Sequence, residues 1–167
     1  TIIMNTDKPI ILDADGINAV SLNTNILKET KAPLILTPHI GEMSRLTGLS
    51  IEEIEKNRVK VAKDFAAEYN CILVLKGANT VVAAPKGTVY INNTGNAGMA
   101  TGGSGDVLAG IIASFVCQSM GLHSATIAGV YIHGLCGDVV REKYSMLGVT
   151  PTRMIDELAE VLSNFEE

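Results

Sequence analysis

Residues 93–106 read NTGNAGMATGGSGD, and residues 107–116 continue as VLAGIIASFV. The first stretch is polar and rich in glycine, whereas the second is apolar on nearly every face, as in a buried helix. A glycine-rich backbone can come close to a ligand, and the first turn of a helix has unpaired N–H groups and a partial positive charge. The sequence therefore predicts an anion-binding loop, suited to a phosphate, before a helix expected over about residues 104–119.

Asp106 stands in the first turn of this expected helix. As a purely structural residue it would interact favourably with the helix dipole, which is worth about 0.3–1 kcal/mol. A phosphate bound nearby would repel the carboxylate, however, so Ser or Thr would serve that structural purpose better. A base that takes a proton from a hydroxyl group attacking the phosphate would need a carboxylate there. On spacing alone, both interpretations of Asp106 stay open.

The composition predicts one domain, over residues 1–167, because 167 residues with 47% hydrophobic content can bury a core. A net charge of −5, the absence of a basic run and the absence of Trp argue against a nucleic-acid partner. Without a signal peptide or an uninterrupted apolar span, we expect a cytoplasmic protein with no membrane partner. Cys71, Cys117 and Cys136 lack metal-ligand spacing, so we expect buried reduced thiols and no protein metal site.

Short apolar runs alternate with helical patterns, which predicts an α/β sheet with ligand-binding loops at the carboxyl ends of its strands. The expected strands are 10–12, 34–36 and 71–75, with a hairpin of 80–84 and 88–92. The expected helices are one carrying Ala19, Leu22 and Leu27, one from Ile51 to Tyr69 after a Ser50–Glu53 capping box, one over 124–142, and one from Pro151 with Phe165 on its buried stripe.

Polar residues follow the first two expected strands. Asp13, Asp15 and Asn18 follow the first strand, and Asp15 either caps the next helix or lines a site. His39 follows the second strand after Pro38, which restrains the backbone before it. A lone histidine is more often a surface or packing residue, but this position after a strand favours a functional interpretation.

Two further residues have competing interpretations. Lys76, after the third expected strand, either carries a solvated charge or binds the phosphates of a nucleotide. His133 lies within an apolar run, which favours a buried and hydrogen-bonded histidine over a catalytic one.

Four segments resemble the motifs of one family, in the order in which that family carries them. They are LDADGIN (12–18), TPHIGE (37–42), KGANT (76–80) and GGSGDVLAG (102–110). The last is similar to the anion hole and catalytic aspartate of the ribokinase-like superfamily. Together the four resemble the ADP/ATP-dependent NAD(P)H-hydrate dehydratases, which repair hydrated nicotinamide cofactors, and the resemblance extends from about Ile10 to Val161.

The resemblance implies a ribokinase-like three-layer α/β sandwich with a mostly parallel central sheet, of which this chain would be the C-terminal portion, with the N-terminal part missing. It implies that Asp106 is the catalytic base. The residues that it implies for nucleotide binding are Lys76, Gly77, Ala78, Asn79, Thr80, Asn96, Gly102, Gly103, Ser104 and Gly105. Those that it implies for binding the hydrated nicotinamide are His39, Gly41, Glu42, Arg45 and Asp106.

The activity that the resemblance implies is dehydration of hydrated NADH or NADPH, by phosphorylation of the hydrate hydroxyl and elimination of phosphate. ADP is expected rather than ATP, since the substrate loop resembles the bacterial type. Mg²⁺ is expected from phosphoryl-transfer chemistry, and a homo-oligomer from the habit of the family. Two alternatives stay open: a small-molecule kinase of the same superfamily, acting on a vitamin precursor or sugar, and a nucleotide-binding fragment without catalysis.

Overall fold

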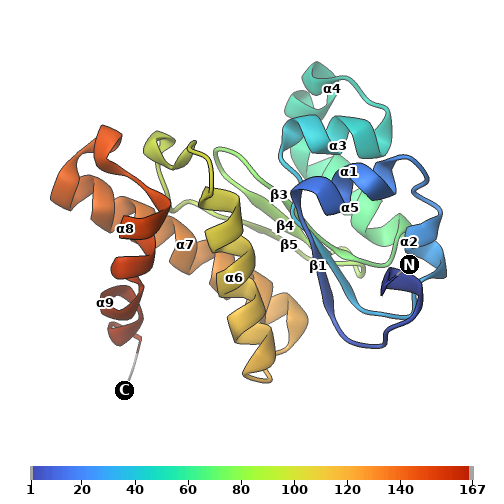
Figure 1. Cartoon of the computed structure of the whole chain (residues 1–167). Helices are drawn as coiled ribbons and strands as arrows, with labels where there is room; N and C mark the ends of the chain where they lie inside the picture. Colours follow the sequence, from blue (N-terminus) through green and yellow to red (C-terminus); the bar gives the residue numbers. More distant parts are fainter. Residues whose placement is uncertain (1, 166–167) are drawn as a thin grey trace. The chain divides into compact units, whose positions relative to one another are not determined.

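The computed structural model describes residues 2–165 of the chain (Figure 1). The chain divides into two compact units, Thr1–Ile91 (unit 1) and Asn92–Glu167 (unit 2). The single domain expected over residues 1–167 stays a prediction. None of the helices within residues 2–165 combines the length and apolar character needed to cross a lipid bilayer.

Unit 1 contains a five-stranded sheet in the order β1-β2-β3-β4-β5. Its strands are β1 (Ile10–Leu12), β2 (Leu34–Leu36), β3 (Ile72–Leu75), β4 (Val81–Ala83) and β5 (Val89–Ile91). The first three strands are parallel, and β4 is antiparallel to both of its neighbours, so four of the five strands share one direction. The expectation of a mostly parallel sheet is confirmed, and every expected strand is present to within one residue at each end.

The helices of unit 1 are η1 (Ile2–Met4), α1 (Ala14–Ser21), α2 (Ile26–Glu29), α3 (Ile40–Thr47), α4 (Ile51–Lys56) and α5 (Arg58–Glu68). Helices α1, α3 and α5 lie on one side of the sheet (Figure 1). Alternate strand residues point toward them, because successive side chains of a strand face opposite ways. The resulting core includes Ile17, Leu34, Leu36, Met43, Ile54, Phe65, Leu73 and Leu75.

Two expectations for the first helix are wrong. Helix α1 ends at Ser21, and Leu22, which we expected within it, is 89% exposed. Asp13 rather than Asp15 occupies the N-cap position, and its side chain makes no capping hydrogen bond. Asp13 instead pairs with a lysine described below, which explains why a capping residue type stands at this position without capping the helix.

The helix expected from Ile51 to Tyr69 is also two helices, α4 and α5, separated at Asn57. The backbone of Asn57 leaves the helical region (φ −135°, ψ 30°), and its side-chain Nδ2 donates to the carbonyl of Glu53 (3.2 Å). Asparagine side chains that bond to nearby backbone groups compete with the helix in this way. The Ser50–Glu53 capping box is confirmed, whereas Ile51 is 52% exposed and does not belong to the core.

Unit 2 is helical after its glycine-rich loop. Its elements are η2 (Ala97–Met99), α6 (Ser104–Cys117), α7 (Leu122–Tyr144), η3 (Met146–Gly148), α8 (Pro151–Asp156) and α9 (Leu158–Ser163). Helix α7 contacts α6, α8 and α9 (Figure 1). The core between these helices includes Val107, Ile111, Ile132, Cys136, Val140, Met154 and Val161.

The last helix begins as expected but does not continue. Thr150 caps α8 and Pro151 takes its first position, yet Glu157 separates α8 from α9. Glu157 is buried and accepts a hydrogen bond from Lys143 of α7 (2.7 Å). Phe165, expected on the buried stripe, is 57% exposed, and its ring lies edge-on to the Tyr131 ring with the centroids 6.3 Å apart.

Two of the three cysteines are buried thiols, as expected. Burial raises the pKa of Cys71 to about 12 and that of Cys136 to about 11, so both are neutral and unreactive at physiological pH. Cys117 is exposed, because it ends α6 where the helix leaves the core, and the expectation that it is buried is wrong.

Candidate functional site

The carboxyl ends of β1, β2 and β3 meet in unit 1 and bring a lysine against two carboxylates. Lys76 Nζ lies 2.6 Å from Asp13 Oδ1 and 3.9 Å from Glu42 Oε2. The backbone of Lys76 also donates to the carbonyl of Pro38 (2.8 Å), which fastens the end of β3 to the loop after β2. The Lys76 ammonium therefore forms an ion pair within unit 1. Its partner, Asp13, was expected at this edge of the sheet, but the sequence did not predict this interaction.

His39, expected to bind substrate, occupies the N-cap of α3. Its Nδ1 accepts hydrogen bonds from the amides of Gly41 (3.0 Å) and Glu42 (3.2 Å), and the buried Glu42 carboxylate accepts from the His39 amide (2.7 Å). This reciprocal arrangement is a capping box with histidine in place of the usual hydroxyl residue. Just over half of the His39 side chain is exposed, so the ring edge is open to a ligand.

Arg45, which we also expected at the substrate, is exposed on α3. Its Nη1 donates to Asn18 Oδ1 of α1 (3.0 Å). The structure thus brings Arg45 together with Asn18, one of the polar residues that follow the first strand.

The segment Lys76–Thr80, expected to bind the nucleotide, forms a tight turn. Gly77 has φ +145°, a value that favours glycine, and Thr80 Oγ1 donates to the Gly77 carbonyl (3.0 Å). Arg58 of α5 donates through Nη2 to the carbonyls of Leu75 (3.0 Å) and Lys76 (3.2 Å). Arg58 therefore holds this turn, and nothing in its sequence position distinguishes it from other charged residues of an amphipathic helix.

The glycine-rich loop of unit 2 is held by hydrogen bonds to α7. Thr94 Oγ1 donates to the Tyr131 carbonyl (3.0 Å), and the Gly95 amide donates to Asp138 Oδ2 (2.7 Å). Asn96 Nδ2 donates to Asp138 Oδ1 (2.9 Å). The sequence does not predict a role for Asp138, because it lies more than thirty residues beyond the loop within an otherwise structural helix.

The glycines of this loop serve two different purposes. A Cβ at Gly98 would lie 2.4 Å from the Met146 carbonyl oxygen, so glycine is required there by packing against η3. A Cβ at Gly102 would meet nothing within 4 Å, so the backbone beside that residue is open. Only part of the glycine content therefore relates to ligand access, which corrects the uniform interpretation made from sequence.

The start of α6 has the features expected of an anion site. Gly103, with φ +90°, is the N-cap and leaves the helix without a side-chain cap. The amides of Gly105 and Asp106 have no hydrogen-bond acceptor within residues 2–165. These N–H groups and the helix dipole together favour an anion at this position.

Ser104, which we expected to bind the nucleotide, is buried and faces α7. His133 Nε2 lies 2.9 Å from the Ser104 carbonyl oxygen and 3.3 Å from its hydroxyl. A carbonyl can only accept, so Nε2 carries a proton and donates to it. The expectation that His133 is a buried, hydrogen-bonded histidine is confirmed.

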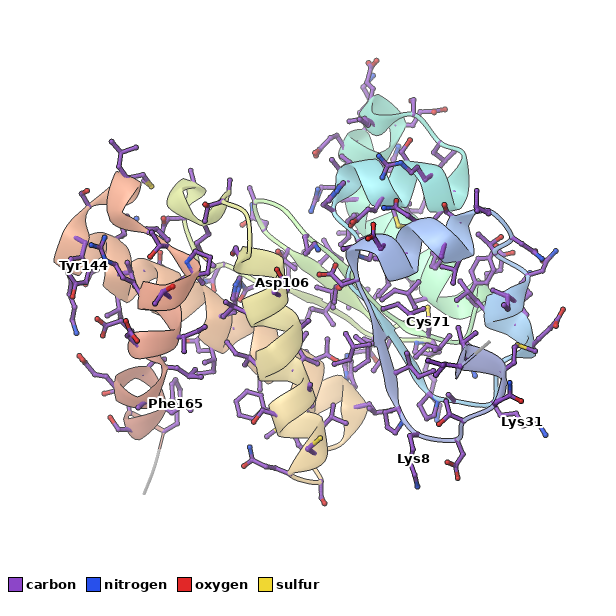
Figure 2. All side chains as sticks on the ribbon, viewed as in Figure 1. Lys8, Lys31, Cys71, Asp106, Tyr144 and Phe165 are labelled. Carbon is purple, nitrogen blue, oxygen red and sulfur yellow. The ribbon has the colours of Figure 1, made fainter. Side chains whose placement is uncertain are left out.

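Asp106 is exposed in the first turn of α6 (Figure 2). Its carboxylate makes no hydrogen bond or ion pair within the described part of the chain. A carboxylate without internal partners beside open amides can accept a proton from a ligand bound there.

The candidate residues are distributed between both units. Unit 1 carries His39, Gly41, Glu42, Arg45, Lys76, Gly77, Ala78, Asn79 and Thr80, and unit 2 carries Asn96, Gly102, Gly103, Ser104, Gly105 and Asp106. No group of three His, Cys, Asp or Glu side chains within residues 2–165 is arranged to hold a metal ion. Mg²⁺ commonly keeps several waters and binds through substrate phosphates and one or two carboxylates, which does not require such a group.

Comparison with known proteins places the chain. A family model described as NAD(P)H-hydrate dehydratase matches residues 1–160. The bifunctional NAD(P)H-hydrate repair enzyme Nnr of Thermofilum pendens is 45% identical over 161 residues, which are 96% of this chain and 31% of that protein. The ADP-dependent (S)-NAD(P)H-hydrate dehydratase of Bacillus subtilis is 36% identical over 164 residues, which are 98% of this chain and 58% of that protein.

The fold agrees with these relatives. The crystal structure of ADP/ATP-dependent NAD(P)H-hydrate dehydratase from Bacillus subtilis, co-crystallized with ATP/Mg²⁺, matches with a TM-score of 0.88 at 35% identity. The match covers 98% of this chain and 57% of that one, and it confirms the ribokinase-like α/β fold. This chain therefore belongs to the NAD(P)H-hydrate dehydratase family.

Proposed function

We propose that the protein carrying this chain dehydrates hydrated NADH and NADPH, with ADP as the phosphoryl donor. Membership of the family supports the substrate, and the ADP-dependent Bacillus relative supports the nucleotide. The observation that carries the proposal is the Asp106 carboxylate, which has no partner within residues 2–165 and stands beside the open amides of α6.

In the proposed reaction, Asp106 takes the proton from the hydroxyl group of the hydrate. The hydroxyl oxygen forms a bond to the terminal phosphorus of ADP, and the bond from that phosphorus to the bridging oxygen breaks and releases AMP. The amides from Gly102 to Gly105 stabilise the charge on the transferring phosphoryl group. The phosphate ester then loses inorganic phosphate and a proton from the adjacent carbon, which restores the double bond of the dihydronicotinamide.

The remaining site residues have binding roles in this proposal. His39, Gly41, Glu42 and Arg45 contact the hydrated nicotinamide, and the turn from Lys76 to Thr80 contacts the nucleotide. Since the Lys76 ammonium is paired with Asp13, we assign this contact mainly to the backbone of the turn. Mg²⁺, when bound, would neutralise the nucleotide phosphates, and the ATP/Mg²⁺ in the Bacillus crystals supports its inclusion.

The proposal also includes the broader setting that the sequence leads us to expect. The protein acts in the cytoplasm as a homo-oligomer, and residues 1–167 belong to a single ribokinase-like domain. The chain spans 31% of the length of the Thermofilum relative and 58% of that of the Bacillus relative. We therefore assign the activity to the whole protein that contains this chain.

The test supplies hydrated NADH and ADP to this protein and measures NADH, AMP and phosphate. We expect all three products in equal amounts, and an Asp106→Asn variant should lose about 10²–10⁴-fold in turnover because its amide cannot accept the proton. Asp156→Asn is the matched control: Asp156 is exposed on α8, forms no ion pair within residues 2–165, and should leave turnover unchanged.

Three outcomes would overturn the proposal. The first is an Asp106→Asn variant with near wild-type turnover. The second is ATP-dependent phosphorylation of pyridoxal, hydroxymethylpyrimidine or ribose without action on hydrated NADH, which indicates a small-molecule kinase. The third is binding of AMP and ADP without turnover of any of these substrates, which indicates a nucleotide-binding module.

A further inference from the structure

The carboxylate of Asp138 on α7 is directed at the beginning of the glycine-rich loop. Its two oxygens accept hydrogen bonds from the Gly95 amide (2.7 Å) and from Asn96 Nδ2 (2.9 Å). Both distances fall in the range of strong, charge-assisted hydrogen bonds. One carboxylate thus fixes a backbone group and a side chain of consecutive loop residues.

Both ends of the Asn96 amide make hydrogen bonds within unit 2. Since a carboxylate oxygen only accepts, Asn96 must present its Nδ2 to Asp138, and its Oδ1 is then left to accept from the Gly98 amide (3.1 Å). This second bond makes Asn96 the N-cap of η2. The orientation that Asp138 imposes on Asn96 therefore also shapes the backbone that leads toward Gly102.

Helix α7 has glycines, without side chains, where the loop packs against it. A Cβ at Gly134 would lie 2.1 Å from Thr94 Oγ1, and one at Gly137 would lie 2.3 Å from Met99 Sδ. The two glycines let the loop approach the helix directly, about one turn or less from Asp138. His133 of the same helix holds Ser104 at the other end of the loop.

We propose that Asp138 and Asn96 form a positioning pair, which holds the glycine-rich loop in the shape that binds the phosphates of the nucleotide. In this role both side chains act on the loop: the Asn96 amide bonds to Asp138 and to the Gly98 amide, and the two oxygens of Asp138 accept from Gly95 and Asn96. The inference rests on the proposed function for the identity of the ligand. It changes the role of Asn96 from nucleotide-binding residue to residue that shapes the loop.

An exchange of the two residue types tests the pair. In Asp138→Asn the new amide can still accept from Gly95, but it presents a donor to the donor of Asn96. In Asn96→Asp two carboxylates face each other. In the double variant, the amide introduced at position 138 can donate to one oxygen of the carboxylate introduced at position 96. The other oxygen of that carboxylate accepts from Gly98, so the network is restored with its donor and acceptor exchanged.

The affinity for AMP and ADP is measured by calorimetry, together with KM for ADP and kcat for hydrated NADH. Losing a hydrogen bond to a charged group should weaken nucleotide binding about 10- to 100-fold in each single variant. The double variant should return to within about threefold of wild type. At saturating ADP, kcat should change much less than KM, since Asp106 and the amides of α6 are unaltered.

Two controls accompany the exchange. Asn164→Asp adds the same charge to an exposed residue that follows α9, and Asp156→Asn removes the same charge from an exposed position of α8. Both should bind nucleotide within about threefold of wild type. Circular dichroism and thermal unfolding verify that each variant is folded, and the double variant keeps the test valid if a single variant unfolds.

Unchanged affinity in both single variants would overturn the inference, and so would a double variant no better than the weaker single one. If the wild-type protein binds ADP but does not act on hydrated NADH, the proposed function is wrong. The positioning pair is then tested by the affinities of the variants for AMP and ADP alone. A wild-type protein that binds neither AMP nor ADP would overturn both.

Discussion

The imidazole of His39 accepts hydrogen bonds from two backbone amides through Nδ1, so a neutral ring carries its proton on Nε2. That nitrogen lies 3.5 Å from Glu42 Oε1, and 54% of the His39 side chain is exposed. The same ring can therefore cap α3 with one nitrogen and contact a ligand with its open edge. Different substitutions of His39 can separate the capping role from the ligand-binding role.

At this residue scale, we expect His39→Asn to keep the cap and His39→Ala to lose it. Asparagine is among the best N-cap residues, whereas alanine should lower the free energy of unfolding by about 0.5–2 kcal/mol, as measured by urea denaturation. Both variants should lose activity toward hydrated NADH, since neither retains the ring. Full activity in His39→Asn would limit His39 to capping, and wild-type stability in His39→Ala would contradict the cap.

At the scale of elements, α7 is the support of unit 2. It contacts α6, α8 and α9, and Gly134 and Gly137 allow the glycine-rich loop to pack against it. Glycine in a helix interior costs about 0.5–1 kcal/mol relative to alanine. Gly134 and Gly137 of α7 therefore stand against helix propensity, because the loop occupies the space that a methyl group would need.

Two Gly→Ala substitutions should accordingly have opposite effects. Gly134→Ala should lower the free energy of unfolding by about 1–3 kcal/mol, because its Cβ would also lie 2.8 Å from the Thr94 backbone carbon, and it should weaken nucleotide binding. Gly110→Ala, on exposed α6 surface with nothing within 4 Å, should raise it by about 0.5–1 kcal/mol. Chemical denaturation measures both, and a stabilising Gly134→Ala would contradict the packing described.

At the scale of the whole molecule, each unit has a carboxylate that resists protonation. The hydroxyl and amide of Ser50 lower the pKa of Glu53 in unit 1, and Lys143 lowers the pKa of Glu160 in unit 2. In both cases the pKa in the folded chain lies below the ordinary value of 4.5. The ionised forms therefore add stability above pH 4.5, and this contribution is lost as the pH falls through the lowered values.

We expect the free energy of unfolding to fall as the pH drops below 4.5, and to fall less steeply in a Glu53→Gln/Glu160→Gln variant. The amides cannot be protonated in this range, so the variant lacks the two carboxylates whose protonation is coupled to unfolding. Glu29→Gln, at an exposed position of α2 with no ion pair within residues 2–165, should retain the wild-type slope. Urea denaturation between about pH 3 and pH 6, a range set by ordinary carboxyl pKa values of about 4, measures the slopes. Equal slopes in all three proteins would contradict the assignment.

Local patterns were sufficient to predict the strands, the hairpin and the starts of α4, α6 and α8, whereas α3 lies in a segment expected to be a loop. Apolar runs bounded by polar residues identify β1, β2 and β3, and Ser50 and Thr150 identify helix starts through their caps. The interruptions at Asn57 and Glu157 could not be predicted in this way. Asn57 bonds back to its own helix, and Glu157 accepts from Lys143 of a different helix, so hydrophobic periodicity does not indicate either interruption.

The family and the position of Asp106 at the start of a helix follow from the linear sequence, because each motif is a run of neighbouring residues. The partners of those residues depend on the folded structure. It paired Lys76 with Asp13, placed Arg58 on the turn after β3 and set Asp138 against Asn96. These contacts join residues between 17 and 63 positions apart, and such distances are closed by packing rather than by any local pattern.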